Sequence, residues 1–224
     1  MNQALPVAAA TVLFMASAPV RPETSSAEQR FRELYKELVE TNTSLSAGSC
    51  TLAAERMAAR LKAAGFTDDE LHLFTAPGHP REGGLVAIYP GRNAKLKAIL
   101  LLAHLDVVEA KREDWTRDPF TLVEENGNFY ARGAVDDKAE GAIWVDTLVR
   151  LREQNYRPLH TLKLALTCGE ETSGALNGAQ WLTQNRRDLI DAAFAINEGA
   201  RGELDAEGHR VALEVQAGEK TSQN

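Results

Sequence analysis

The sequence predicts an α/β fold, a three-layer αβα sandwich around a mostly parallel mixed sheet. Apolar, strand-like segments alternate along the chain with segments whose apolar residues recur at helical spacing, which is the pattern of βα units. The unbroken apolar run at 97–104 is typical of a strand that is buried on both faces of such a sheet. Asn126-Gly127 predicts a tight hairpin turn, which adds a short antiparallel pair at the margin.

The expected elements follow from apolar spacing and from capping and turn residues. Ser25 and Glu28 form a capping-box pattern at the start of the first helix. Leu52 is expected on the inward face of the second helix, and Gly65 is expected to end it. The expected helices span about 25–40, 50–64, 137–151 and 175–184. The expected strands span about 71–73, 84–89, 97–104, 120–123, 129–131, 161–167, 192–196 and 211–215.

Composition limits the classes of protein to which the chain can belong. The 224 residues are 44% apolar and 25% charged, which is ordinary for a soluble globular protein with a substantial core. The net charge of -7 argues against binding of nucleic acid, which requires a basic surface. An acidic excess suits binding of cations, although a solvated acidic surface is its commoner cause. Cys50 and Cys168 lie far apart without a disulfide framework or a zinc-knuckle spacing, so both are expected to be buried or half-buried thiols.

Residues 1–20 have the pattern of a secretory signal peptide. The segment from Leu5 to Ala16 is apolar, and Ala16-Ser17-Ala18 offers a cleavage site, but no Lys or Arg precedes Arg21. The apolar segment is too short for a comfortable membrane span, and no later segment could cross a bilayer. We therefore expect a periplasmic or secreted protein without a membrane anchor in its mature form. If the segment is instead a disordered or helical tail, the protein is cytoplasmic.

The end of the buried strand at 97–104 carries the first candidate site residues. His104 would emerge at the carboxyl end of this strand, where ligands gather in parallel sheets. Asp106 lies two residues later, and residues two apart in extended backbone point the same way. The Asp106 carboxylate can therefore accept a hydrogen bond from one ring nitrogen of His104, which makes the other nitrogen a better metal ligand.

Acidic side chains occur at the ends of three further expected elements: Asp136-Asp137, Glu170-Glu171 and Glu198. Each has a simpler interpretation. The two aspartates could be a helix N-cap, the glutamate pair could be a solvated loop before a helix, and Glu198 could lie in a surface turn. Together, clusters at the ends of consecutive elements favour a single metal site.

The residue types indicate which metals would bind. One imidazole with several carboxylates suits zinc, cobalt or manganese. A carboxylate has two oxygens, so one aspartate can bridge two cations that lie ~3.5–4 Å apart. Glu170 and Glu171 project in different directions, so one can bind metal while the other accepts a proton from metal-bound water and passes it to a leaving amine.

Five segments of the chain occur in the order typical of one enzyme family. They are His104-Leu105-Asp106-Val107-Val108, Trp115-x-x-Asp118-Pro119-Phe120, Arg132-Gly133-Ala134-Val135-Asp136-Asp137-Lys138, Gly169-Glu170-Glu171-x-x-Gly174 and Asn197-Glu198-Gly199. Over roughly residues 30–215 the chain resembles the dinuclear zinc amidohydrolases and peptidases that include aminoacylase, acetylornithine deacetylase, succinyl-diaminopimelate desuccinylase, carnosinase and glutamate carboxypeptidase.

The resemblance implies a role for each candidate residue. His104 and Glu198 would bind the first zinc ion, Glu171 would bind the second, and Asp136 would bridge both. Glu170 would be the general base, and Asp106 would orient His104. The peptide bond after Asp136 would be cis. The implied reaction is hydrolysis of an amide bond next to a free carboxylate, by a carboxypeptidase, a dipeptidase or an N-acyl-amino-acid deacylase. Its substrate would be a small peptide or an N-acyl amino acid.

The chain departs from the family pattern after residue 215. The family supplies one more metal-binding histidine late in its sequence, after an inserted lid or dimerisation domain. The other histidines here lie at different places: His72, His79, His160 and His209. We therefore expect residues 25–224 to be the N-terminal part of the catalytic domain, truncated before the lid and inactive alone. A homodimer would be possible only with the lid domain.

Two alternative functions stay open. A related zinc aminopeptidase would have a similar order of ligands, but the segments 115–120 and 132–138 argue against it. A non-catalytic binding domain could retain the fold, although such relatives usually lose ligands, and the ligands expected in this part of the chain are present.

Overall fold

The computed structural model describes residues 26–172, 174–199 and 202–213, so the predicted signal peptide at 1–20 and the expected cap Ser25 lie outside it. The helices are α1 (Ser26–Glu40), α2 (Cys50–Ala63), α3 (Lys138–Glu153), α4 (Gly178–Asn185) and α5 (Arg187–Ile190), with 3-10 helices at Asp68–Glu70 and Arg112–Asp114. The strands are β1 (Leu71–Ala76), β2 (His79–Tyr89), β3 (Ile99–His104), β4 (Val123–Glu125), β5 (Asn128–Tyr130), β6 (Leu162–Thr167), β7 (Phe194–Ile196), β8 (Gly202–Leu204) and β9 (Arg210–Leu213). None of these helices is both long enough and apolar enough for a membrane span.

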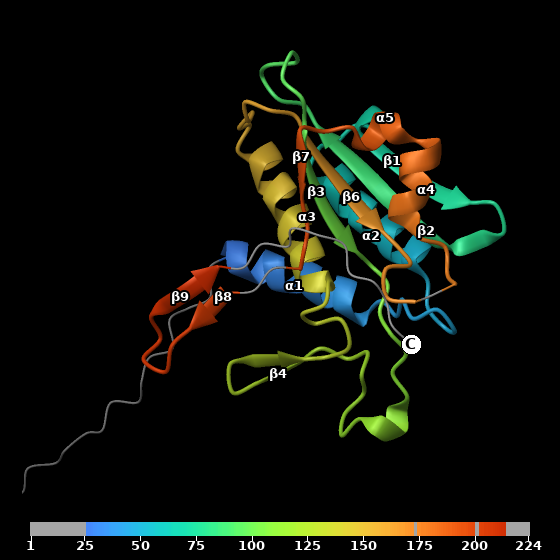
Figure 1. The fold of residues 1–224 in the computed structure, drawn as a ribbon, viewed down its shortest axis with the longest axis vertical. Helices are drawn as coiled ribbons and strands as arrows, with labels where there is room; N and C mark the ends of the chain where they lie inside the picture. The colour runs from blue at the N-terminus through green and yellow to red at the C-terminus, as the bar shows by residue number, and fades with distance from the viewer. Residues whose placement is uncertain (1–25, 173, 200–201, 214–224) are drawn as a thin grey trace, which may run out of the picture.

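Five strands form one mixed sheet in the order β1-β2-β6-β3-β7. β3 runs parallel to β6 and to β7, whereas β2 pairs antiparallel with both β1 and β6. Figure 1 shows α4 and α5 in front of this sheet and α2 behind it. Side chains of α1 and α3 share one core with those of α2 and therefore belong to the same rear layer. The predicted three-layer αβα fold is confirmed.

Alternate side chains of the central strands fill two cores, one on each face of the sheet. Leu101 and Leu166 point into the larger core, which the sheet shares with α1, α2 and α3. Leu100 and Ala165 point into the smaller core, which contains residues of α4 and α5. Because helices cover both faces of the sheet, β3 is apolar from Ile99 to Ala103, as the sequence predicted.

Leu52, which was expected to face inward, is exposed, and so is Leu73 in an expected strand. Leu52 is 42% exposed, because α2 packs through its alanines and through Met57 and Leu61. Leu73 is 52% exposed, since the edge strand β1 buries only alternate positions toward its end.

Two hairpins lie apart from the main sheet (Figure 1). β4 and β5 form the predicted hairpin, and its turn residues Asn126 and Gly127 have positive φ angles of 52° and 77°. The second hairpin pairs β8 with β9. Only its second strand was predicted, and residues 214 and 215 of that prediction lie outside the described chain.

The parallel strands bring their carboxyl ends to one edge of the sheet. β3 ends at His104, which pairs with Thr167 at the end of β6. β7 lies on the other side of β3 and ends at Ile196, two residues before Glu198. Segments that follow parallel strands meet at such an edge, so the strand order alone brings most of the candidate site residues together.

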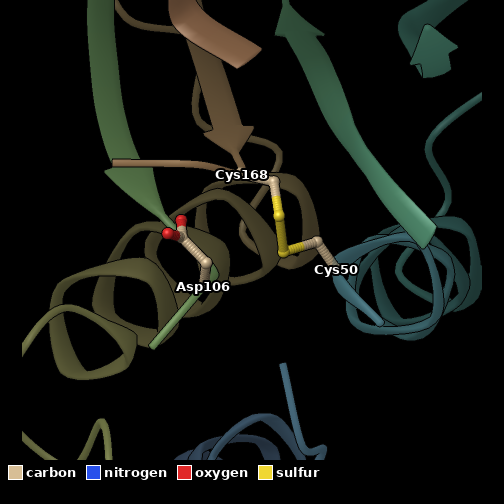
Figure 2. Close-up of side chains that lie close together, drawn as sticks. All are labelled: Cys50, Asp106 and Cys168. Atoms are coloured by element: carbon tan, nitrogen blue, oxygen red, sulfur yellow. A yellow bond between two sulfur atoms is a disulfide. The ribbon is translucent and has the colours of Figure 1, made fainter. Parts of the chain in front are cut away.

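The two cysteines form a disulfide, so the prediction of free thiols was wrong. Cys50 at the start of α2 is bonded to Cys168 just after β6, with Cα atoms 6.0 Å apart and a sequence separation of 118 (Figure 2). Both residues are buried, as predicted. The pairing depends on where α2 begins relative to the end of β6, which is a tertiary relation that the spacing of the cysteines does not encode.

Candidate metal centre

His104 is the centre of the candidate site. Its side chain is only 3% exposed, and its Nε2 atom faces three carboxylates. Nε2 lies 2.9 Å from Oδ1 of Asp136, 3.5 Å from Oε1 of Glu198 and 3.9 Å from Oε2 of Glu170. The ring therefore faces a cluster of carboxylates at the carboxyl edge of the sheet.

The structure brings all four predicted ligands together. Ligand atoms of His104, Asp136 and Glu171 lie within 4.8 Å of one another, and so do those of His104, Asp137 and Glu198. The two groups share His104. Of the histidines in the described chain, none besides His104 belongs to either group.

Asp106 contacts His104 differently from the prediction. Nδ1 of His104 bonds to the backbone carbonyl of Asp106 at 3.0 Å, and the Asp106 carboxylate lies 3.6 Å from this nitrogen. The carboxylate oxygens instead accept hydrogen bonds from the backbone amides of Glu170, at 3.3 Å, and of Glu171, at 3.0 Å. Burial alone would raise the pKa of Asp106, but His104 and these amides outweigh it and lower the pKa. Asp106 thus positions both the imidazole and the glutamate pair.

Asp137 is a site residue that the sequence analysis left as a possible N-cap. It precedes α3 without capping it; its buried Oδ2 accepts a hydrogen bond from the backbone amide of His104 at 3.2 Å. Burial and the charge of Glu140 raise the pKa of Asp137 to about 7. The peptide bond between Asp136 and Asp137 is cis, as the resemblance implied. Asp137 could have been suspected from the sequence because it is adjacent to Asp136, but the sequence does not show that both aspartates contact His104.

Two further residues fix the segment that carries Asp136. Lys138 is completely buried, and its Nζ donates to the carbonyl of Thr41 at 2.7 Å, beyond the end of α1. The hydroxyl of Tyr35 on α1 donates to the carbonyl of Ala134 at 2.6 Å. Neither role was predicted from the sequence.

The charges of the pocket favour a bound cation. Burial lowers the pKa of His104, but the charges of Asp106, Asp137 and Glu198 outweigh it and raise the pKa to about 10. Burial raises the pKa of Glu171, and the charge of Asp136 raises it further. Burial and neighbouring carboxylates also raise the pKa of Glu198. Repulsion among carboxylates that face one imidazole is relieved by a divalent cation, so the donor set fits zinc or a similar borderline metal.

Comparison with known proteins assigns the family. The model of peptidase family M20/M25/M40 matches residues 100–216, more than half of the chain. The chain belongs to peptidase family M20/M25/M40. The M20 assignment confirms the resemblance on which the sequence analysis relied, and it makes the chain part of a family of hydrolases that depend on metal.

This chain is similar to part of the sequence of several M20 proteins. Human aminoacylase-1 is 32% identical over 122 residues, which are 54% of this chain and 30% of that protein. A probable succinyl-diaminopimelate desuccinylase from Staphylococcus aureus is 45% identical over 74 residues, 33% of this chain and 18% of that protein.

Solved structures share the fold. An M20 family metallo-carboxypeptidase from Sulfolobus solfataricus is 25% identical with a TM-score of 0.62, over 80% of this chain and 38% of that chain. Human carnosine dipeptidase 1 is 20% identical with a TM-score of 0.57, over 76% of this chain and 38% of that chain. The chain thus spans less than two fifths of the length of each of these relatives.

Proposed function

We propose that the protein containing this chain hydrolyses an amide bond next to a free carboxylate, in a small peptide or an N-acyl amino acid, with two zinc ions. The observation that carries the proposal is the convergence of three carboxylates on Nε2 of the buried His104. The names of the relatives support the substrate class, since they include an aminoacylase, a dipeptidase and a metallo-carboxypeptidase.

Each ligand has a place in the proposed centre. His104 and Glu198 would bind one ion, Glu171 would bind the other, and Asp136 would bridge the pair. The carboxylate of Asp136 suits the bridge because it lies within reach of both Nε2 of His104 and a carboxylate oxygen of Glu171. Bound zinc supplies Lewis acidity and lowers the pKa of the water it holds to ~7. Cobalt or manganese would suit the same ligands.

Glu170 would act as the general base and then the general acid. Its side chain is 55% exposed, so substrate and water can reach it, while its backbone amide is held by Asp106. The Glu170 carboxylate would take a proton from the attacking water and donate it to the leaving nitrogen of the amide. Oε2 of Glu170 lies 3.9 Å from Nε2 of His104, so the proposed base is close to the proposed metal ligands.

We also propose that the protein works in an oxidising compartment, as a periplasmic or secreted enzyme. The buried disulfide between Cys50 and Cys168 supports this location, because structural disulfides persist in such compartments and are rare in the cytosol. The pattern of a signal peptide at residues 1–20 is independent support from the sequence.

The test combines metal counting with substrate specificity. The purified chain should bind zinc at His104, and Glu170→Gln should retain that zinc, because Glu170 is not a proposed ligand. In the protein that contains the chain, Glu170→Gln should abolish turnover of N-acetyl amino acids and of dipeptides. A substrate with a blocked carboxyl end should resist hydrolysis; if only substrates with a free amino end are cleaved, the protein is an aminopeptidase.

The chain by itself should bind metal weakly and turn over little. The two ligand groups at this site share one imidazole, that of His104, whereas two ions require more ligands than these. Full activity of the purified 224-residue chain would contradict this expectation. A chain without zinc or turnover in any context would indicate a non-catalytic binding domain.

A further inference from the structure

The disulfide lies at the base of the loop that carries the glutamate pair. Cys168 follows β6 directly and precedes Gly169 and Glu170. Its partner Cys50 is the first residue of α2, which belongs to a different layer. Figure 2 shows the bond between these two elements with Asp106 beside it, and sulfur and carboxylate oxygen atoms of the three residues lie within 4.8 Å of one another.

Cys168 holds both ends of this loop. Its side chain is bonded to Cys50 at the entrance, and its backbone carbonyl accepts a hydrogen bond from the amide of Gly178 at 2.7 Å, where α4 begins. Among the described residues of the loop, the other anchors are the two amides bonded to Asp106 and the amide of Leu176, which donates to Glu82 at 2.9 Å. A movement of Cys168 therefore moves the whole loop.

The bond is the covalent link between this loop and α2. Met57 and Leu61 anchor α2 in the core, and both cysteines are buried, so the bond holds Cys168 against a fixed helix. Without the bond, the described residues of the loop after β6 keep only the hydrogen bonds to Asp106, Glu82 and Gly178.

We propose that the Cys50–Cys168 disulfide is a positioning bond that keeps the backbone of Glu170 and Glu171 against the Asp106 carboxylate, and that breaking it weakens metal binding at Glu171. This inference rests on the proposed function for its metal-binding part. A dithiol breaks the bond by supplying two electrons and two protons, so that two protein thiols form and the dithiol becomes a disulfide. The glutamate pair would then no longer be held in its position relative to His104.

The test uses the double variant Cys50→Ala/Cys168→Ala, which has no thiol that could bind zinc itself. Its zinc dissociation constant, measured by competition with a chromophoric chelator, should rise about tenfold or more, the loss typical of residues that orient metal ligands. Amide hydrogen exchange at Glu170 and Glu171 should accelerate in the metal-free protein. Ser49→Ala is the matched control, because it removes the N-cap of α2 next to Cys50 but leaves the disulfide intact. This control should keep the zinc affinity and the exchange rates of the loop.

Wild-type zinc affinity and wild-type exchange at Glu170 and Glu171 in the double variant would overturn the inference. Removal of a disulfide destabilises the whole fold, so faster exchange in α1 and α3 is expected. Acceleration confined to such core amides, with none at Glu170 and Glu171, would also overturn the inference. If the double variant does not fold, exchange in the metal-free wild-type chain with and without a dithiol decides the same question. If the wild-type chain binds no zinc, the proposed function fails, while the exchange measurement still decides whether the disulfide positions the loop.

Discussion

Replacement of Gly169 by alanine should perturb the site more than the same change elsewhere in its loop. Gly169 has a φ angle of +87°, and a Cβ atom there would lie 1.8 Å from the backbone carbonyl oxygen of Leu176. A left-handed conformation costs an alanine about 1–2 kcal/mol, and overpacking adds about 1–3 kcal/mol. The obstacle is backbone, which cannot rotate away as a side chain could. Gly169→Ala should therefore lower the free energy of unfolding by about 2–5 kcal/mol.

Gly174→Ala separates the two contributions. Gly174 has nearly the same φ angle, +84°, but no atom outside its chain neighbours lies within 4 Å of a Cβ there. Gly174→Ala should therefore lower the free energy of unfolding by only about 1–2 kcal/mol, the cost of the left-handed backbone conformation. Urea denaturation measures both free energies, and zinc titration of the same samples should show weaker binding in Gly169→Ala alone, because Glu170 follows it directly. Equal stability and equal zinc affinity of the two variants would refute the claim that the loop is closely packed at Gly169.

Three other predictions test separate parts of the structure. The pKa of His104 is raised to about 10 from an ordinary value of 6.5, so its charge stabilises the metal-free fold fully below pH 6.5 and is lost as the pH rises toward 10. The stability difference between wild type and His104→Gln should thus shrink over this range in denaturation experiments, and a constant difference would contradict the raised pKa. Loss of the Cys50–Cys168 bond, which closes a loop of 118 residues, should lower the free energy of unfolding by up to about 5 kcal/mol in urea denaturation; a change under about 1 kcal/mol would show that the unfolded chain gains little freedom. Lys138→Met leaves the carbonyl of Thr41 without its donor and should cost about 1–3 kcal/mol by the same measurement, and no loss would show that the buried amine contributes nothing net.

The convergence of the site could be predicted because strands that alternate with helices form a mostly parallel sheet, whose carboxyl ends meet at one edge. The apolar run before His104 indicated a strand covered on both faces, and the acidic pairs follow elements that such a sheet aligns. Because β3, β6 and β7 are parallel, His104, Glu171 and Glu198 lie at the same edge of the sheet. Asp136 reaches them from the segment before α3. The side-chain contacts within the site were less predictable. Asp106 was expected to bond His104 through its carboxylate, yet that carboxylate holds the amides of Glu170 and Glu171.

The errors have a common physical cause, which is that contacts between layers leave no local pattern. The pairing of Cys50 with Cys168 depends on α2 meeting the end of β6. Leu52 was expected on the inward face of α2, but the alanines of α2 pack in the core together with Met57 and Leu61 and leave Leu52 exposed. Nothing in the sequence distinguishes Lys138 from an exposed helix residue. Its burial results from the packing of α1 against α3.

The central claim is that His104, Asp136, Glu171 and Glu198 hold zinc in one pocket. The most direct measurement is an anomalous difference map, recorded at the zinc absorption edge from a crystal of this chain soaked in zinc. The claim predicts a peak within ~2.0–2.2 Å of Nε2 of His104 and of carboxylate oxygens from these ligands. Its absence at saturating zinc, or a peak only at the exposed group of Asp205, Glu207 and His209, would contradict the account.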